Sequence, residues 1–253
     1  MRNLIFVFLA MYACALSAQN YSVTNYTTSN SAIGSNNITA LKGDSNGNIW
    51  AGTAANGISK FTGGAWTNLT TTNGLVGNNV KSIDVDGLGN VWIATSAGLS
   101  KYNGTTFTNY TTAQGLPTND LRCVYADAAN NIWVGTTAGV SKYNGVSFTT
   151  YTTSDGLLHN TVLAITQDLS GNMWFGTATG VNKFTGTVWT DHTNLNGINT
   201  NGDQVQTACT DADGNVWVGS LPSMGIGGGL YKWNGASWTT YTTTNGLAHN
   251  DVR

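Results

Sequence analysis

The sequence predicts an all-β protein built from copies of one small unit. Three observations support this prediction: a tryptophan recurs at a nearly constant interval, short segments are rich in β-branched and aromatic residues, and glycine is abundant, with 32 copies in 253 residues. The intervals between the recurring tryptophans are 42, 41, 41 and 43 residues, and these residues are Trp50, Trp92, Trp133, Trp174 and Trp217. A fixed period of about 40 residues indicates one supersecondary unit that is copied and stacked.

Each copy contains four short segments separated by turns. In the second copy they are Val80–Ile83, the tryptophan segment that follows Gly89-Asn90, Leu99–Tyr102 and Thr106–Thr111. Aspartate opens the first turn in every copy, at Asp44, Asp86, Asp127, Asp168 and Asp211. Asn-Gly pairs such as Asn103-Gly104 separate the last two segments and favour a tight β-hairpin. A Gly-Leu turn such as Gly115-Leu116 ends the copy.

These segments predict β-strands, and their number predicts a β-propeller. They are four to seven residues long, rich in Val, Ile, Thr, Tyr, Phe and Trp, and bounded by Gly, Asn and Asp. Four antiparallel strands in about 40 residues suit one propeller blade. The first two segments are apolar on both faces, as expected between neighbouring blades, and the Thr-rich fourth suits an outer strand. A β-sandwich is the alternative, but it does not explain the constant spacing of the tryptophans.

The order of these motifs resembles a known family of repeats. Gly-Leu-x-x-Asn/Asp, then Asp-x-x-Gly-Asn-x-Trp-x-Gly-Thr, then Gly-Leu/Val-Ser-Lys-Tyr-Asn-Gly resembles the two-component regulator propeller repeat, over five full copies from about Ile38 to Tyr241. The resemblance implies a propeller like the extracytoplasmic sensor of bacterial hybrid histidine kinases, and the repeat also occurs in secreted proteins. Because these motifs build the blade, they imply no particular ligand.

The two ends of the chain lead to separate expectations. Residues 1–18 are expected to be a secretory signal peptide, because Arg2 precedes an apolar stretch of 13 residues and small residues precede Gln19. Residues 19–253 are then the propeller domain. Tyr26-Thr27-Thr28 matches the end of a fourth segment, and Asp251–Arg253 begins a sixth copy. We therefore expect a chain cut from a propeller of six, seven or more blades, in which a kinase or a sorting domain follows.

Composition excludes several classes of partner and chemistry. The mature chain has 9 basic and 12 acidic residues, so nucleic acid is not an expected partner. After residue 18 no apolar run is long enough to insert into a membrane. The chain has no glutamate, and five of its aspartates occupy the repeated turn, where they are expected to cap backbone N–H groups. We therefore expect no catalytic residues, no cofactor and no metal, with a polysaccharide hydrolase or lyase as the rival class.

Some residues invite a chemical interpretation, but the repeat offers a structural one. The turns at Asp44 and Asp211 resemble the opening of a calcium loop, yet they lack its closing carboxylate. Cys123 occupies a slot for small residues, and we expect no disulfide with Cys209. One lysine recurs in every copy, which indicates an architectural role; these residues are Lys60, Lys101, Lys142, Lys183 and Lys232. Trp66, Trp189 and Trp238 fill an outer-strand slot and are expected to pack.

A ligand site is expected where the copies differ. One variable column lies five residues before the turn aspartate and contains Thr39, Lys81, Arg122, Leu163 and Gln206. On the innermost strand these side chains could face the axial channel. The fifth copy also has a lengthened loop that ends at Asp203 and a glycine-rich insertion that contains Met224. His159 and His249 share a loop position. The candidate ligand-binding residues are Lys81, Arg122, Gln206, His159, Asp203 and Met224.

The function expected from these observations is non-catalytic recognition outside the cytoplasm. The protein is expected to be exported and to lie in the periplasm, on the cell surface or in the medium. An oligosaccharide, implied by the resemblance to the sensors, and a protein partner are the two expected ligands. A secreted adhesive or scaffold propeller is the alternative within the same fold.

Overall fold

A computed structural model describes residues 23–193, 204–221 and 228–253. In these ranges the chain forms five four-stranded antiparallel sheets, which we number as blades one to five in chain order. The strands are β1 (Ile38–Gly43), β2 (Ile49–Thr53), β3 (Ile58–Thr62) and β4 (Ala65–Leu69); β5 (Val80–Val85), β6 (Val91–Thr95), β7 (Gly98–Tyr102) and β8 (Phe107–Tyr110); β9 (Leu121–Ala126), β10 (Ile132–Thr136), β11 (Val140–Tyr143) and β12 (Phe148–Tyr151); β13 (Val162–Gln167), β14 (Met173–Thr177), β15 (Gly180–Phe184) and β16 (Trp189–His192); and β17 (Gln204–Thr210), β18 (Val216–Leu221), β19 (Gly229–Trp233) and β20 (Trp238–Tyr241). The predicted all-β fold and its five full repeats are confirmed.

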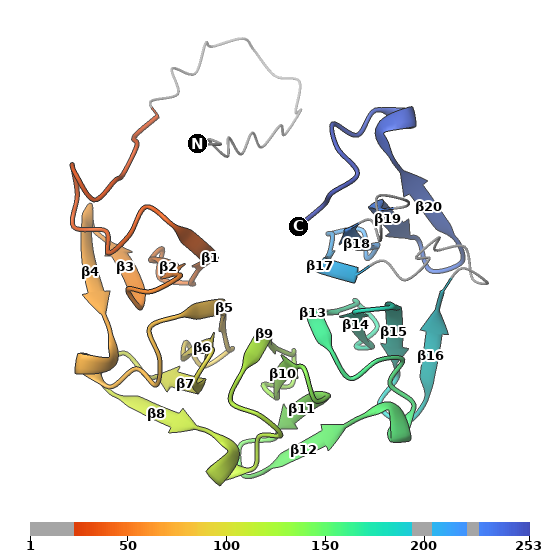
Figure 1. Cartoon of the computed structure of the whole chain (residues 1–253), viewed down its shortest axis with the longest axis horizontal. Helices are drawn as coiled ribbons and strands as arrows, with labels where there is room; N and C mark the ends of the chain where they lie inside the picture. The colour runs from red at the N-terminus through yellow and green to blue at the C-terminus, as the bar shows by residue number, and fades with distance from the viewer. Residues whose placement is uncertain (1–22, 194–203, 222–227) are drawn as a thin grey trace.

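The blades form an arc with the first strand of each blade on the inside and the fourth on the outside (Figure 1). Consecutive inner strands contact one another, from β1 with β5 to β13 with β17. The second strands are the most buried, and in β6, β10 and β14 every residue is buried. The fourth strands are half exposed. The polarity gradient of the four segments therefore predicted their radial order correctly.

One feature of the turns was not predicted. The Gly-Leu turns contain single turns of 3-10 helix, η1 (Thr71–Asn73), η2 (Thr112–Gln114), η3 (Thr153–Asp155) and η5 (Thr243–Asn245). Each ends at a glycine in the left-handed region, with φ of 105° at Gly74. After the first three turns the next leucine is buried in the core, and Leu75 is only 3% exposed. The first three of these turns connect the outer strand of one blade to the inner strand of the next, and η5 follows β20.

Every blade contains a frame of four residue types, joined by hydrogen bonds and by a cation–π contact. In blade three, Oδ1 of Asp127 accepts hydrogen bonds from the backbone N–H groups of Ala129 (3.0 Å) and Asn131 (2.8 Å). Its Oδ2 accepts from Nε1 of Trp133 and from Nδ2 of Asn131, both at 2.9 Å. Nζ of Lys142 lies 5.3 Å from the centre of the Trp133 ring. The repeated aspartate, asparagine, tryptophan and lysine are therefore one structural unit.

In blades one, two, four and five the frame lowers the pKa of its aspartate and so stabilises the charged form. Burial by itself would raise the pKa of Asp86, but the hydrogen bonds from Trp92 and Asn90 outweigh burial and lower it. In blade five the hydrogen bond from Trp217, with that from Asn215, lowers the pKa of Asp211 to about 2. The calcium-loop resemblance at this turn is thus explained by the protein's own donors, which occupy both carboxylate oxygens.

Replacing Asp127 with alanine is expected to destabilise the protein by about 3 kcal/mol, because buried donors of Trp133 and Asn131 lose their acceptor. Urea denaturation followed by tryptophan fluorescence measures this change. Asp213→Ala is the matched control, because Asp213 is exposed in the same turn of blade five and its counterpart in blade three is already an alanine, Ala129. An equal loss of stability in the two variants would contradict the role assigned to the frame.

The chain on either side of the five blades repeats contacts seen within them. Tyr26 packs on Phe61 and Trp66 of blade one, with ring centres 5.2 and 5.8 Å apart. Tyr110, at the end of β8, packs on Tyr143 and Phe148 of blade three at 5.1 and 5.7 Å. Tyr26 thus has the surroundings of a fourth-strand tyrosine. It lies outside any strand, because the described residues supply no third strand with which it could pair.

The segment after β20 returns to the inside of the arc (Figure 1). The backbone N–H of Val252 donates to the carbonyl oxygen of Ser220 at 3.1 Å. A Cβ atom built on Gly219 would lie 2.5 Å from Cγ1 of Val252, and one on Gly52 would lie 2.5 Å from Cγ1 of Val80. Val252 therefore has the position of the first residue of an inner strand, as the sequence predicted.

Candidate ligand site

A pocket of about 380 Å³ lies on the inside of the arc, against the first strands of blades two to five. Its lining includes Lys81 on β5, Arg122 on β9, Leu163 on β13 and Gln206 on β17. These are four of the five residues in the variable column, and Thr39 in blade one is outside the lining. The structure therefore brings together three candidate ligand-binding residues, namely Lys81, Arg122 and Gln206.

A β-bulge in each inner strand explains why this column varies. Val80 pairs with Thr95 and Ser82 pairs with Ala94, so Lys81 between them has no partner on β6. The same register shift omits Thr39, Arg122, Leu163 and Gln206 from their ladders. An unpaired bulge residue has its side chain redirected out of the sheet. The residue type at the bulge is therefore not restricted by packing in the core, whereas Val80 beside it is fully buried.

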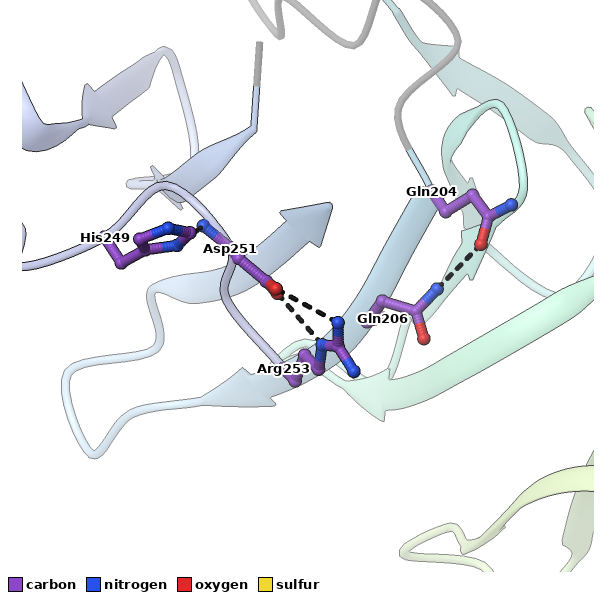
Figure 2. Close-up of polar contacts among 5 residues, drawn as sticks. All are labelled: Gln204, Gln206, His249, Asp251 and Arg253. Atoms are coloured by element: carbon purple, nitrogen blue, oxygen red, sulfur yellow. Dashed lines mark hydrogen bonds and ion pairs between the residues drawn. The ribbon is translucent and has the colours of Figure 1, made fainter. Parts of the chain in front are cut away.

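The pocket presents hydrogen-bond donors from cationic and amide side chains. Nη2 of Arg122 donates to Oδ2 of Asp120 at 2.8 Å, while its Nε is buried without a hydrogen-bond partner among the described residues. Within the same part of the chain, Lys81 makes no ion pair. Nε2 of Gln206 donates to Oε1 of Gln204 at 3.0 Å (Figure 2). Small neighbours such as Ser82 and Ala164 complete the wall.

Arg253 has the sequence position that matches Arg122, although it lies outside any described strand and outside the pocket lining. It follows Val252 as Arg122 follows Leu121, and its Nε and Nη2 each lie 3.0 Å from the carboxylate of Asp251 (Figure 2). Asp120 and Asp251 are equivalent, each two residues before its arginine. The phrase Asp251-Val252-Arg253 repeats Asp120-Leu121-Arg122 and was the available signal. The variable column is defined by its distance from a turn aspartate, which Arg253 lacks in the given sequence.

The other candidate residues lie elsewhere. Nδ1 of His159 accepts the backbone N–H of Thr161 at 2.9 Å and stabilises the loop before β13; His159 is not part of the pocket lining. His249 makes the equivalent bond to Asp251, also at 2.9 Å. Asp203, Met224 and most of the two enlarged loops of blade five lie outside the described residues.

The cysteine beside the pocket is unsuited to nucleophilic chemistry. Burial raises the pKa of the Cys123 thiol to about 12, so the thiol stays protonated at neutral pH. Burial also raises the pKa of Cys209, and both cysteines are free. In the described ranges no cluster of three His, Cys or Asp side chains has a metal-binding arrangement. The arrangement of Lys81, Arg122 and Gln206 is suited to binding through donors.

His192 on β16 is a titratable group that the sequence analysis did not single out. It takes the place of Tyr110 and Tyr151 in other blades and packs between Trp174 and Trp233, with ring centres 5.0 and 5.1 Å away. Its Nδ1 accepts a hydrogen bond from Nε1 of Trp238 at 3.1 Å. Burial, together with the charge of Lys183, lowers the pKa of His192 to about 4.

Acid is therefore expected to destabilise blade four through His192. Because the folded pKa lies below that of a free histidine, the stabilising contribution is complete above about pH 6.5 and is lost as the pH falls towards 4, by roughly 3 kcal/mol at most. His192→Tyr, which restores the residue of blades two and three, is expected to flatten this part of the stability curve. Urea midpoints between pH 7 and pH 4 measure the slopes; equal slopes would contradict the assignment.

The fold defines a repeat protein of the β-propeller class, with a pocket on the inside of the arc. Residues 32–55 and 115–138 match the family model described as "Two component regulator propeller". This confirms the resemblance inferred from the repeat. No curated protein matches the chain significantly.

Solved structures with the same architecture place the chain among propellers. The extracellular domain assigned to the hybrid two component system BT3049 of B. thetaiotaomicron is 27% identical with a TM-score of 0.72, over 86% of this chain and 30% of that one. PorZ, a surface component of the type-IX secretion system of Porphyromonas gingivalis, is 18% identical with a TM-score of 0.65, over 85% and 35%. Virginiamycin B lyase of Staphylococcus aureus is 15% identical with a TM-score of 0.64, over 81% and 69%.

These similarities differ in what they support. The chain spans less than a third of the BT3049 domain, so the comparison covers only part of that protein. At 18% and 15% identity, PorZ and the lyase share the fold alone. In the described part of the chain, we find no helix with the length and hydropathy needed to cross a bilayer. The family match and the BT3049 domain thus agree in relating this chain to propellers of two component systems.

Proposed function

We propose that this chain is a non-catalytic recognition module that acts outside the cytoplasm and binds its ligand on the inside of the arc. The observation that carries the proposal is the column of bulged residues, Lys81, Arg122, Leu163 and Gln206, gathered on one pocket. Around them the frame residues repeat from blade to blade. Variable side chains on an invariant scaffold are typical of binding sites.

Location outside the cytoplasm is supported by the extracellular domain that the chain resembles and by the expected signal peptide at residues 1–18. In a sensor, the bound ligand would be reported to a kinase in another part of the protein. Reading the codons that follow Arg253 tests this finer proposal. A transmembrane segment followed by histidine-kinase motifs would support it, and a sorting domain would favour a secreted binder instead.

Binding at the pocket can be tested by filling it. Leu163→Trp places a large ring between Arg122 and Gln206 and is expected to abolish binding of any ligand found on an array of oligosaccharides. Val146→Trp is the matched control, because Val146 is 87% exposed on the hairpin between β11 and β12. Unchanged binding in Leu163→Trp, with melting temperature preserved, would overturn the assignment of the pocket. Turnover of an array member by the purified chain would overturn the non-catalytic proposal.

A further inference from the structure

The basic residues of this chain have a restricted distribution. Of its ten lysines and arginines, five lie over the blade tryptophans, with Nζ 5.1 to 5.4 Å from the ring centres. The others in the described residues are Lys42, Lys81, Arg122 and Arg253. Lys42 forms an ion pair with Asp84. Of the remaining three, Lys81 and Arg122 occupy the bulged column, where other blades carry Thr39, Leu163 or Gln206, and Arg253 follows Val252 outside any described strand.

The basic groups of the pocket have unused binding capacity. Lys81 makes no ion pair with any described residue, and the buried Nε of Arg122 lacks a hydrogen-bond partner. Asp120 takes up only one edge of the Arg122 guanidinium. A guanidinium donates in a planar fork that matches the two oxygens of a carboxylate or another oxyanion. Both cations are half buried, which strengthens their attraction to an anion compared with open solvent.

Apolar residues lie beside these cations. Leu163 occupies the column between Arg122 and Gln206, and Val124 and Ile165 also contribute to the lining. An inorganic anion would leave this part of the pocket unused. A larger molecule could place an acidic group at Lys81 and Arg122 and an apolar face on Leu163, with Gln206 near its polar edge.

We infer that the pocket binds an organic anion, with its oxyanion held between Lys81 and Arg122. This inference rests on the proposed recognition function and specifies its ligand class as a molecule that bears a carboxylate, a sulfate ester or a phosphate ester. The formal charge of the chain is −2, so attraction to such a molecule depends on the local cations rather than on the charge of the whole protein.

Pairs of ligands that differ only in charge test the inference. Isothermal titration calorimetry on the full chain would compare oligogalacturonate with its methyl ester, dextran sulfate oligosaccharide with dextran, a phosphorylated oligosaccharide with its dephosphorylated form, and inorganic phosphate alone. At least one acidic oligosaccharide is expected to bind with an affinity that falls as salt is added. Its uncharged counterpart and phosphate alone are expected to bind at least tenfold more weakly.

Three variants locate the anion. Lys81→Ala and Arg122→Ala are each expected to weaken binding about tenfold, the effect of losing one hydrogen bond to a charged group. Asp120→Asn is expected to tighten binding about threefold, because it releases the guanidinium from its ion pair. Arg122→Ala and Asp120→Asn, two substitutions at half-buried polar residues, are expected to change affinity in opposite directions. A general loss of folding would not produce that result, and melting temperatures monitor folding independently.

Two other results would overturn the inference. If no acidic compound binds, or if Lys81→Ala and Arg122→Ala bind as the parent does, the oxyanion site is wrong. If a neutral oligosaccharide binds and Leu163→Trp abolishes its binding while Lys81→Ala does not, the proposed recognition function stands and only the ligand class is wrong. Failure of the inference is thus distinguishable from failure of the function.

Discussion

Replacing Trp133 with alanine is expected to destabilise the protein by about 4 kcal/mol, a typical cost for truncating a buried tryptophan. Trp133 is 2% exposed and packs against Tyr151, Phe175 and Phe184, with ring centres 5.4 to 6.2 Å away. The truncation also removes the donor to Asp127. The variant therefore has a cavity next to a carboxylate, that of Asp127, which has lost one of its hydrogen-bond donors.

Trp66→Phe is the matched control for this prediction. Trp66 lies on the outer strand β4, where Phe107 and Phe148 occupy the equivalent positions, and its Nε1 has no hydrogen-bond partner among the described residues. We expect its replacement to change stability by less than about 1 kcal/mol. Thermal and urea denaturation of both variants measure the difference. Similar losses would show that the tryptophans of the repeat and of the outer strand have equivalent roles.

Replacing Gly135 with valine is expected to cost about 3 kcal/mol through overpacking between blades three and four. A Cβ atom on Gly135 would lie 2.9 Å from the carbonyl oxygen of Val162 and 3.0 Å from its Cγ1, and would clash with Sγ of Cys123. Blade two tolerates Ala94 at the equivalent position, where the paired residue is the smaller Ser82. The glycine therefore sets how closely β10 approaches β13 of the next blade.

Gly43→Val provides the comparison within a strand. Gly43 ends β1, and a Cβ atom there would meet only Cδ1 of Ile49 at 3.9 Å. The free energy of unfolding of Gly43→Val is expected to stay within about 0.5 kcal/mol of that of the parent. Urea denaturation of Gly135→Val and Gly43→Val separates the inter-blade contact from the general effect of valine in a strand. A small effect at Gly135 would mean that the blades can separate without cost.

Most of the fold could be predicted because its information is local and repeated. Five copies of one pattern gave five independent indications of each strand, and the predicted extent from Ile38 to Tyr241 agrees with the first and last strands. The 3-10 turns escaped prediction because three residues, such as Thr71–Asn73, are too few to produce a periodic signal. The turn aspartate was predicted to cap backbone N–H groups, and Asp127 does so. Its hydrogen bond from Trp133 and the contact of Lys142 with that ring were not predicted, because they join side chains across strands.

The candidate site was predictable in part. Variation between copies pointed to Lys81, Arg122 and Gln206, which the structure gathers on one pocket. The same reasoning selected His159, whose ring nitrogen is engaged by the backbone of its own loop. It passed over Arg253, which has no turn aspartate after it. Comparison of the copies shows which positions vary, but contacts between blades decide which of the variable side chains lie close together.

The sequence by itself determined the blade, its four strands and their radial order, because alternation, turn residues and spacing act over a few residues and recur on a fixed period. Only the tertiary structure decided that the variable residues face one shared pocket. A bulge at each of them interrupts the ladder and redirects the side chain, and the curvature of the arc then brings residues about 40 positions apart to the same place. Convergence of this kind depends on how the blades stack.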